Sequence, residues 1–403
     1  MALRRGIVRS FIGLTVAGGI VAALSGPAWA LSETPDITWE TNKILYASVQ
    51  LGNTLFVGGG NTIVEPIGKP RYGFPVSGLA AFDITTGEGI STWTPEVTST
   101  TGTPMVRSLA LSPDGTWLYV GGNFDAIDGQ PLRNLGRVST ATGEVDPTFA
   151  PEVGDSTSFV YALLAMGDRV YCGGTFVRIS GTRRPKLAAI DTDGTLDPDW
   201  VPPVPDAKVD SLALASDGAT IFVGGHFMGL GGVPRQSVAR VTTDTGALDP
   251  WAIPTGTIVA PQTAWTLVAT PTRLFGGFGS KGPNYLAAFH LDNGNTGNQV
   301  WRFGTVGNVQ TIALSPSGTQ LFFGGHFGLG RLQQNVCGNI PLKGLAVVDP
   351  VNGQIDCSWV PYIEPNNYQG PHSMVVNDTY LWIAGKFSTI EGVRHHDVAR
   401  FTL

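Results

Sequence analysis

The chain has 403 residues, of which 42% are hydrophobic, 14% are charged and 54 are glycine, and its formal net charge is −6. This hydrophobic content can fill a core and excludes intrinsic disorder, and the abundant glycine suits many tight turns between short strands. The acidic balance argues against nucleic acid or an anionic membrane surface as the partner.

The first thirty residues have the pattern of a cleavable signal peptide. Three arginines within residues 4–9 precede an apolar stretch from Phe11 to Leu24. Ala28-Trp29-Ala30 then gives the small-x-small pattern that signal peptidase recognises. The apolar stretch is short for a membrane span. We therefore expect cleavage after Ala30 and export of residues 31–403 as a secreted, extracellular protein that does not insert into a membrane. Removing residues 1–30 leaves 22 basic and 31 acidic residues, a formal charge of −9.

One sequence motif recurs along the rest of the chain: an apolar, strand-like segment, then Gly-Gly, a variable residue and Phe. The clear copies stand at residues 121–124, 173–176, 224–227 and 324–327, and weaker copies stand at 58–60, 276–278 and 384–387. These seven copies recur about every fifty residues, which is the spacing of propeller blades rather than of solenoid turns.

The second repeat has four strand-like segments. They are residues 106–111, 117–120, 135–138 and 145–149. Tight turns at Ser112-Pro113-Asp114-Gly115 and Thr142-Gly143 join the first pair and the last pair. The segments are rich in β-branched and aromatic residues, and no helical periodicity is present. The sequence therefore predicts an all-β fold, a seven-bladed β-propeller of four-stranded blades over residues 31–403.

The two ends of the chain predict how the ring closes. Other repeats end in a fourth strand such as 146–149, whereas the last repeat stops at its third strand, 399–403. A segment of the missing kind, Pro35-Asp36-Ile37-Thr38-Trp39, stands near the N-terminus. We expect this N-terminal strand to complete the last blade and to cover its exposed edge.

The sequence motif of the repeat resembles that of a known family. Gly-Gly-x-Phe, a loop ending in Ala-Arg, and Thr-Gly-x-Leu-Asp-Pro, as at residues 245–250, look like the delta-sixty repeat of bacterial secreted propellers. The motif is also similar to the repeats of kelch-like propellers in cell-surface polarity proteins. The resemblance covers essentially all of residues 35–403 and is weakest in repeats one and five. It implies the propeller fold and no particular activity, because the motif residues are structural.

The loops of the repeats differ in length on the two faces of the predicted ring. Turns between first and second and between third and fourth strands are short. The second-to-third loops and the blade-to-blade connections are long and varied, as at residues 61–77, 96–104, 328–342 and 364–372. We call the face that carries them the long-loop face, and it is the candidate functional face because binding residues concentrate on variable loops. The alternative is that these are merely tolerated surface loops.

One aligned position marks the candidate ligand-binding site. It lies at the start of each innermost strand, at the mouth of the central channel on the long-loop face, and holds Tyr46, Arg107, Tyr161, Asp210, Trp265, Gln310 and His372. A purely structural ring would repeat small or aliphatic residues. Aromatic rings beside polar groups suit a sugar or another planar polar ligand. Drift at exposed positions would give a similar mixture and is the alternative.

Three cysteines have two expected roles. Cys337 and Cys357 flank one segment and are expected to form a disulfide in an oxidising compartment. Cys172 occupies a position where other repeats have valine, so a buried, inert thiol is expected.

No residue cluster predicts a metal site, a bound cofactor or a catalytic group. His226 and His326 occupy the variable place before Phe in two repeats and are expected to make structural contacts. His395 and His396 are adjacent in the last long loop, where a solvated loop is the expectation.

These observations favour a monomeric, non-enzymatic binding or scaffold protein. Its partner would be an extracellular protein or an envelope glycan, bound through the long-loop face, with no nucleic acid involved. The alternative is a propeller enzyme, a glycan lyase, lactonase or quinone-dependent dehydrogenase, with its site at the channel mouth. Arg107, Asp210 and His372 keep that alternative open, and a calcium-stabilised structural module is a third possibility.

Overall fold

The computed structural model describes residues 31–258, 262–280, 282–292, 294, 296–328, 337–338, 342–365 and 369–403. The expected signal peptide at residues 1–30 lies outside the described residues. Within the described part, regular structure is almost entirely β-strand, and the helical element there is one short 3-10 helix, η1 (Pro70–Tyr72). No helix among these residues has the length and apolar character needed to cross a membrane.

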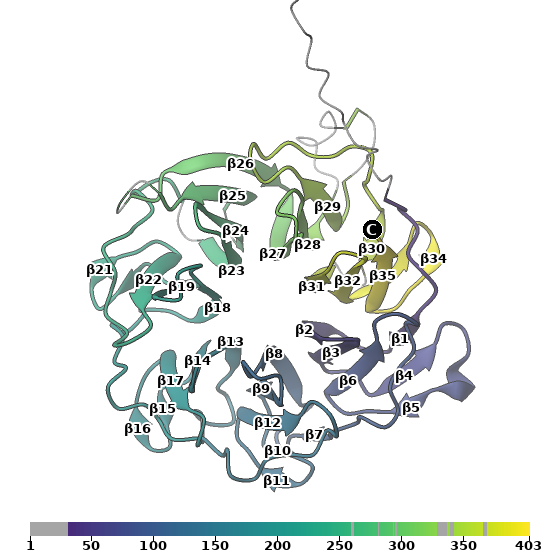
Figure 1. Cartoon of the computed structure of the whole chain (residues 1–403), viewed down its shortest axis with the longest axis horizontal. Coiled ribbons are helices and arrows are strands. Elements are labelled where there is room, and N and C mark those ends of the chain that lie inside the picture. Colours follow the sequence, from purple (N-terminus) through teal and green to yellow (C-terminus); the bar gives the residue numbers. More distant parts are fainter. Residues whose placement is uncertain are drawn as a thin grey trace, which may run out of the picture. The chain divides into compact units, whose positions relative to one another are not determined.

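Short antiparallel sheets follow one another along the chain and stand around a common axis (Figure 1). Their innermost strands are β2 (Leu45–Leu51), β8 (Met105–Leu111), β13 (Val160–Met166), β18 (Val209–Leu214), β23 (Gln262–Ala269), β27 (Gly307–Leu314) and β31 (Pro371–Val376). Each innermost strand contacts the next along the chain, and β31 also contacts β2. The axis is therefore lined by first strands alone.

Two further strands complete most sheets. The middle strands are β3 (Thr54–Gly59), β9 (Trp117–Asn123), β14 (Arg169–Gly174), β19 (Thr220–Gly225), β24 (Arg273–Ser280), β28 (Leu321–Phe327) and β32 (Tyr380–Gly385). The third strands are β6 (Leu79–Asp83), β12 (Leu135–Ser139), β17 (Leu187–Asp191), β22 (Val238–Thr242), β25 (Asn284–His290), β29 (Leu345–Val348) and β35 (Val398–Thr402).

The fourth segment of the repeat forms a full strand in one sheet, as β26 (Gln299–Thr305) beside β25. Elsewhere in the described chain it makes single bridges, for example Val138 with Val145 and Val241 with Leu248. A proline such as Pro147 follows soon after and has no N–H to extend the ladder. Four-stranded blades are therefore not confirmed by the strand pairings.

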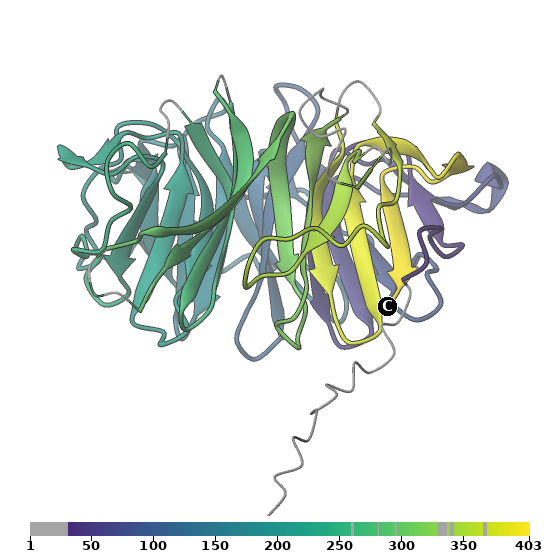
Figure 2. The same ribbon diagram turned by 90° about the horizontal axis from the view of Figure 1, so that it is seen from above.

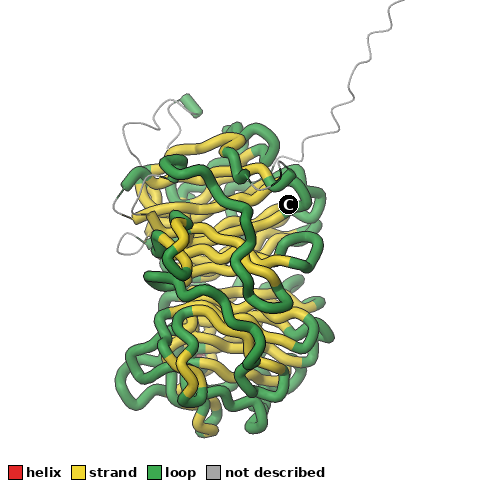
Figure 3. The backbone as a smooth tube through the Cα atoms, turned by 90° about the vertical axis from the view of Figure 1, so that its left-hand side faces the viewer, coloured by secondary structure: helices red, strands yellow, loops and turns green. Residues whose placement is uncertain are grey.

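Small additional sheets extend the loops that follow the middle strands. They comprise β1 (Trp39–Thr41), β4 (Ile63–Pro66) and β5 (Phe74–Pro75); β7 (Val97–Thr98), β10 (Ala126–Ile127) and β11 (Gln130–Pro131); β15 (Arg178–Ile179) and β16 (Thr182–Arg183); β20 (Gly229–Leu230) and β21 (Val233–Pro234); and β30 (Ile363–Pro365), β33 (Phe387–Ile390) and β34 (Val393–Arg394). Figure 2 shows the main strands running between two opposite faces where the loops lie, and Figure 3 shows the same division into strands and loops from the side.

The core lies between neighbouring sheets rather than in one place. Phe56 and Leu79 of one sheet pack with Leu118 and Val120 of the next. Middle strands are buried along almost their whole length because a sheet covers each side, whereas β8 alternates between buried and half-buried residues. This burial of apolar faces against the next sheet supplies most of the driving force for the fold.

A second kind of contact joins neighbouring sheets. The indole N–H of a buried tryptophan at the end of one repeat donates to a backbone carbonyl near the end of the next repeat's third strand. These pairs are Trp93 with Ser139, Trp200 with Thr242, Trp251 with His290 and Trp301 with Pro350. The tryptophan of the sixth repeat, Trp359, instead donates to Ser32 at 2.9 Å.

The N-terminal segment lies against the last sheet. Asp36 forms a single bridge with Arg400 of β35, and its backbone N–H donates to the Arg400 carbonyl at 2.8 Å. The chain then leaves this sheet, because Trp39–Thr41 pairs with β4. Residues 35–39, expected as a fourth strand, thus contribute one bridged residue rather than a strand.

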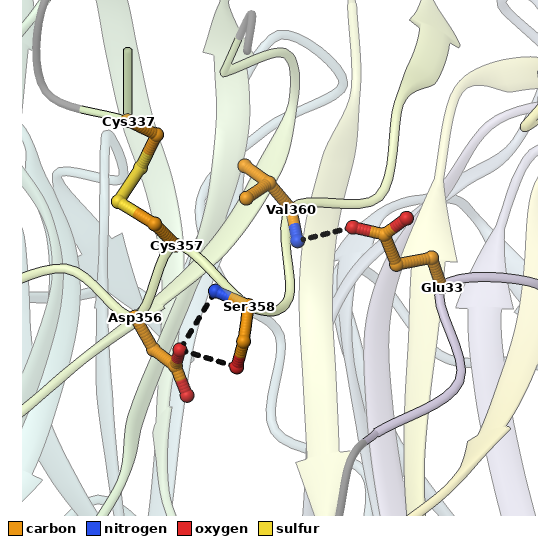
Figure 4. The surroundings of a disulfide bond; sticks show 6 residues. All are labelled: Glu33, Cys337, Asp356, Cys357, Ser358 and Val360. Carbon is orange, nitrogen blue, oxygen red and sulfur yellow. Dashed lines mark hydrogen bonds between the residues drawn. A yellow bond between two sulfur atoms is a disulfide. The ribbon is translucent and has the colours of Figure 1, made fainter.

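Cys337 and Cys357, the pair expected to bridge, are joined by a disulfide (Figure 4). Close to it, the backbone N–H of Val360 donates to the carboxylate of Glu33 at 3.0 Å. Cys172 is a free cysteine on β14, and its burial raises the pKa of the thiol to about 12. An un-ionised thiol at that depth is a poor nucleophile.

Candidate functional site

Every innermost strand carries a β-bulge near its start. In the first sheet, Leu45 pairs with Gly59 and Ala47 pairs with Gly58, so Tyr46 has no partner of its own. The same shift skips one residue in each of the other six innermost strands. The skipped residues are Tyr46, Arg107, Tyr161, Asp210, Trp265, Gln310 and His372. A bulge re-aims the side chain it releases from the ladder, and here it does so at the seven aligned positions.

The Gly-Gly pair of the repeat makes room for this bulge. A β-carbon on Gly174 would lie 1.9 Å from the carbonyl oxygen of Phe159, which precedes the bulged strand. A β-carbon on Gly173 would lie 2.4 Å from Val209 Cγ1 of the next innermost strand. The second glycine therefore admits the bulged backbone and the first admits the neighbouring sheet, because no larger residue fits either place.

All seven bulged side chains line one cavity of about 480 Å³. Two residues that the alignment did not include, His326 and Gln369, complete its wall. His326 lies near the end of β28 and Gln369 lies in the segment leading into β31. Both places adjoin the connections of the long-loop face, so the cavity opens on that side of the molecule.

Cations and aromatic rings alternate along one side of the cavity mouth. The Arg107 guanidinium lies 3.7 Å from the centroid of the Tyr46 ring and 5.1 Å from that of Tyr161. Lys208 Nζ lies 5.0 Å from the Tyr161 centroid and 4.8 Å from the Trp265 centroid. These are cation–π distances, and they hold the five side chains in one fixed arc.

Asp210 is buried within this arc. Its Oδ1 lies 2.5 Å from Lys208 Nζ, and its side chain is 4% exposed whereas that of Lys208 is 31% exposed. Burial raises the pKa of the Asp210 carboxyl, and the Lys208 and Arg107 charges act against that rise. The carboxyl group thus depends on the cations beside it to carry charge at this depth.

The two histidines of the cavity favour the neutral form. Burial, with a smaller contribution from the charge of Arg107, lowers the pKa of His372 to about 3. Burial also lowers the pKa of His326. The His372 ring packs against Tyr46 with a centroid distance of 5.0 Å. At neutral pH these imidazoles therefore offer hydrogen-bonding nitrogens and add no charge to the cavity.

Buried polar atoms around the cavity have no protein partner among the described residues. They are Asp210 Oδ2, Trp265 Nε1, Gln310 Oε1, Gln369 Oε1 and His372 Nε2. Leaving such an atom unpaired costs about 1–3 kcal/mol, so buried polar groups in proteins are nearly always paired. Five of them at one cavity indicate a place built to receive hydrogen-bonding groups from outside the protein.

The channel beneath the mouth has a different character. Its wall carries small hydroxyl residues that stand one or two positions after the bulged residue of the innermost strands. Ser48 and Ser373 hydrogen-bond to each other at 2.7 Å, and Ser211 donates to the Ala264 carbonyl at 3.0 Å. These hydroxyls are satisfied by neighbouring sheets, so the unpaired polar groups concentrate at the mouth.

The other histidines do not form a site. His226 Nδ1 hydrogen-bonds to Thr263 Oγ1 at 2.7 Å, a contact within the protein. His395 is 1% exposed and its pKa is lowered to about 4 by burial, so the expectation of a solvated loop there was wrong. The loop folds over Glu40, which is itself buried and accepts hydrogen bonds from Arg394 and from the His396 backbone. Within the described ranges no three potential ligands gather as a metal site.

Comparison with known proteins supports the fold. The sequence model of a domain of unknown function (DUF5122), described as a beta-propeller, matches residues 168–199, which lie within the third repeat. Together with the many small antiparallel sheets, this match supports an all-β propeller fold. No curated protein matches the sequence.

A solved structure is similar at the level of fold. The extracellular domain of a candidate one component system, BT4673, from B. thetaiotaomicron superposes with a TM-score of 0.51 at 12% sequence identity. The match covers 91% of this chain and 39% of that chain. At this identity the likeness concerns the fold alone, and propeller folds carry many unrelated functions.

Proposed function

We propose that the chain is an exported, non-enzymatic binding or scaffold protein. Its long-loop face meets an extracellular protein or an envelope glycan, and its channel mouth takes a polar group of that target. One observation carries this proposal: seven side chains from seven repeats converge on one cavity that also holds five unpartnered polar atoms. Structural repetition alone would not select six residue types over the seven copies of one aligned position.

The scaffold in this proposal is a seven-bladed propeller of the delta-sixty kind, with each main sheet a blade. The N-terminal segment closes the ring by standing in for the fourth strand of the last blade. In support, Arg400 pairs with Asp36 at 2.7 Å just as Arg137 pairs with Asp146 within the second repeat. Trp359 likewise donates to Ser32 where other tryptophans reach the following repeat.

Export is the second part of the proposal. It is supported by the signal-like pattern at residues 1–30 and by the disulfide, since such bonds persist in oxidising compartments. A rigid ring with a polar cavity and variable loops suits a protein that recognises targets outside the cell.

A thermal-melt screen of the purified protein tests the proposal. The panel holds neutral and acidic oligosaccharides, lactones, pyrroloquinoline quinone with calcium, and a chelator. A ligand at a hundred times its dissociation constant stabilises the fold by about 2.7 kcal/mol, which a melting curve detects. We expect a glycan to raise the melting temperature of wild type and of Glu88→Ala, an exposed position on a short turn, but not of Gln310→Ala. If the melting shift survives Gln310→Ala and Arg107→Ala alike, the ligand binds elsewhere and the channel mouth is not the site.

A second candidate function is a glycan lyase. Tyr46 packs against the neutral imidazole of His372, and the Arg107 guanidinium lies 3.7 Å from the Tyr46 ring centroid. In such an elimination the neutral His372 imidazole would take the proton beside a sugar carboxylate, the Tyr46 hydroxyl would give a proton to the leaving oxygen, and Arg107 would hold the carboxylate. Release of unsaturated sugar from an acidic oligosaccharide by wild type, and its loss in His372→Gln, would replace the binding proposal with this one.

A further inference from the structure

The cavity mouth carries one cation, Arg107, that forms no ion pair with a carboxylate. Every aspartate and glutamate beyond residue 30 lies in the described part of the chain, and none is within ion-pair distance of Arg107. The nearby carboxylate, Asp210, is held by Lys208 instead. Among the residues that the structure describes, the mouth therefore has two cations, Arg107 and Lys208, and one anion, Asp210, although the whole chain is acidic.

Arg107 also lacks strong hydrogen-bond acceptors. The one polar contact of its guanidinium among the described side chains is a long one, 3.7 Å, from Nη1 to the Met105 sulfur. Its remaining attraction is to the faces of Tyr46 and Tyr161. A guanidinium has five N–H donors in a fork that matches a carboxylate, so this group is poised for an anionic partner.

Most of the unpartnered polar atoms beside Arg107 require a hydrogen-bond donor rather than an acceptor. Asp210 Oδ2, Gln310 Oε1 and Gln369 Oε1 are acceptors, and only Trp265 Nε1 in this set is necessarily a donor. Acceptors without partners are satisfied by O–H groups. The cavity is thus complementary to a ligand that has an anionic group at one place and several hydroxyl donors around it.

The aromatic faces leave little room for a ligand to stack. Tyr161 lies parallel to Phe159 at a centroid distance of 5.2 Å, and both Arg107 and Lys208 approach its ring. Tyr46 has Arg107 over one face and His372 beside it. Recognition therefore falls to the charged and hydrogen-bonding edges of the cavity rather than to ring stacking.

We infer that the channel mouth binds an acidic saccharide, a sugar carrying a carboxylate. The carboxylate docks on the Arg107 guanidinium, and the sugar hydroxyls donate to Asp210, Gln310 and Gln369. This inference rests on the proposed binding function of the same cavity and names the chemical class of its ligand. The cavity volume, about 480 Å³, lies in the range of small-ligand sites.

Isothermal titration of the purified protein with matched pairs of probes tests the inference. The probes are trigalacturonate, glucuronate and mannuronate trimers, each with its methyl ester, which removes the carboxylate charge and adds one methyl group at each carboxyl, and galactotriose as the neutral reference. We expect at least one acidic sugar to bind at least tenfold more tightly than its ester, with the difference shrinking as salt is raised. Arg107→Gln should reduce the affinity for the acid to that for the ester, whereas Gln310→Ala should weaken both and Glu88→Ala neither.

Each other outcome has a definite meaning. Equal binding of acid, ester and neutral sugar overturns the acidic preference and leaves the proposed glycan-binding function standing. Tight binding of the acid that Arg107→Gln does not change also overturns the inference, because the anion then docks elsewhere. Absence of binding by every sugar overturns the inference and removes the glycan version of the proposed function, so that a protein partner becomes the remaining target.

Discussion

Asp397 in the last repeat and Asn134 in the second have the same structural role, which is to form the turn before the third strand. Both have left-handed backbone angles, with φ of 67° and 63°, just before the third strand. Each accepts a backbone N–H with its side-chain oxygen, from Phe387 at 3.1 Å and from Phe124 at 3.2 Å. Asparagine and aspartate tolerate this backbone region better than other residues with a β-carbon. The difference between them is one charge.

That charge makes the last repeat sensitive to pH. The Asp397 side chain is 2% exposed, and burial outweighs the Lys386 ammonium at 3.2 Å, so the pKa of the carboxyl rises to about 6. Between the unfolded value near 3.8 and this value the folded protein keeps a proton that the unfolded chain has released. The free energy of unfolding therefore falls as the pH rises from about 4 to about 6.

Asp397→Asn should remove this loss. Relative to wild type, we expect the variant to gain on the order of 2 kcal/mol of stability as the pH rises from 4 to 7. Urea denaturation of both proteins at four pH values measures the difference, in which all other titrating groups cancel. A constant difference across this range would mean that Asp397 stays ionised in the folded protein throughout.

Single residues also show which parts of the candidate site could be predicted from the sequence and which could not. The seven bulged positions could be aligned because each lies 11 to 14 residues before the Gly-Gly pair or, in the last repeat, before Ala384-Gly385. His326 and His226 occupy the same place in the repeat, yet His326 lines the cavity whereas His226 bonds to Thr263. Side-chain direction at a half-buried position depends on neighbours from another repeat. Gln369 comes from a connection without periodicity, so no pattern singled it out.

At the scale of elements, the paired glycines and the bulged strand form one device. The glycines of the middle strand allow the innermost strand to kink, and the kink turns one side chain into the cavity. The repeated motif is thus structural, as expected, and it also positions the site. The fourth strands are not confirmed as a general feature: the proline inside residues 145–149 limits the pairing of that segment to one bridge, whereas β26 forms a full strand.

Gly174→Ala tests this device in the third repeat. The new methyl group would lie 1.9 Å from the Phe159 carbonyl oxygen, a backbone atom that cannot move without opening the β13–β14 pair. We expect a loss of about 1–3 kcal/mol, as for overpacked interiors, and a shifted Tyr161 side chain. Gly304→Ala on β26 is the control, because a β-carbon there meets nothing within 4 Å. Equal urea midpoints for the two variants would show that the glycine is not required for the bulge.

At the scale of the whole molecule, the proposed ring closure depends on contacts between the two ends of the chain. Arg400 Nε lies 2.7 Å from Asp36 Oδ2, and Thr402 donates to the same oxygen. The equivalent pair Arg240–Asp249 joins segments that are already continuous in the chain. Losing the terminal contact should therefore free a segment, whereas losing the internal one should only strain it.

Asp36→Lys places two cations together and should detach the N-terminal segment from β35. We expect a loss of about 2 kcal/mol, together with faster amide hydrogen exchange in residues 36–41 and in β35. Adding Arg400→Glu restores an ion pair of opposite sense and should recover at least half of the lost stability. Asp249→Lys is the matched control, for which exchange should rise only around Asp249 and Arg240. If exchange in β35 is the same in Asp36→Lys as in wild type, the N-terminal segment does not hold the last blade, and closure rests on the contact between β31 and β2 alone.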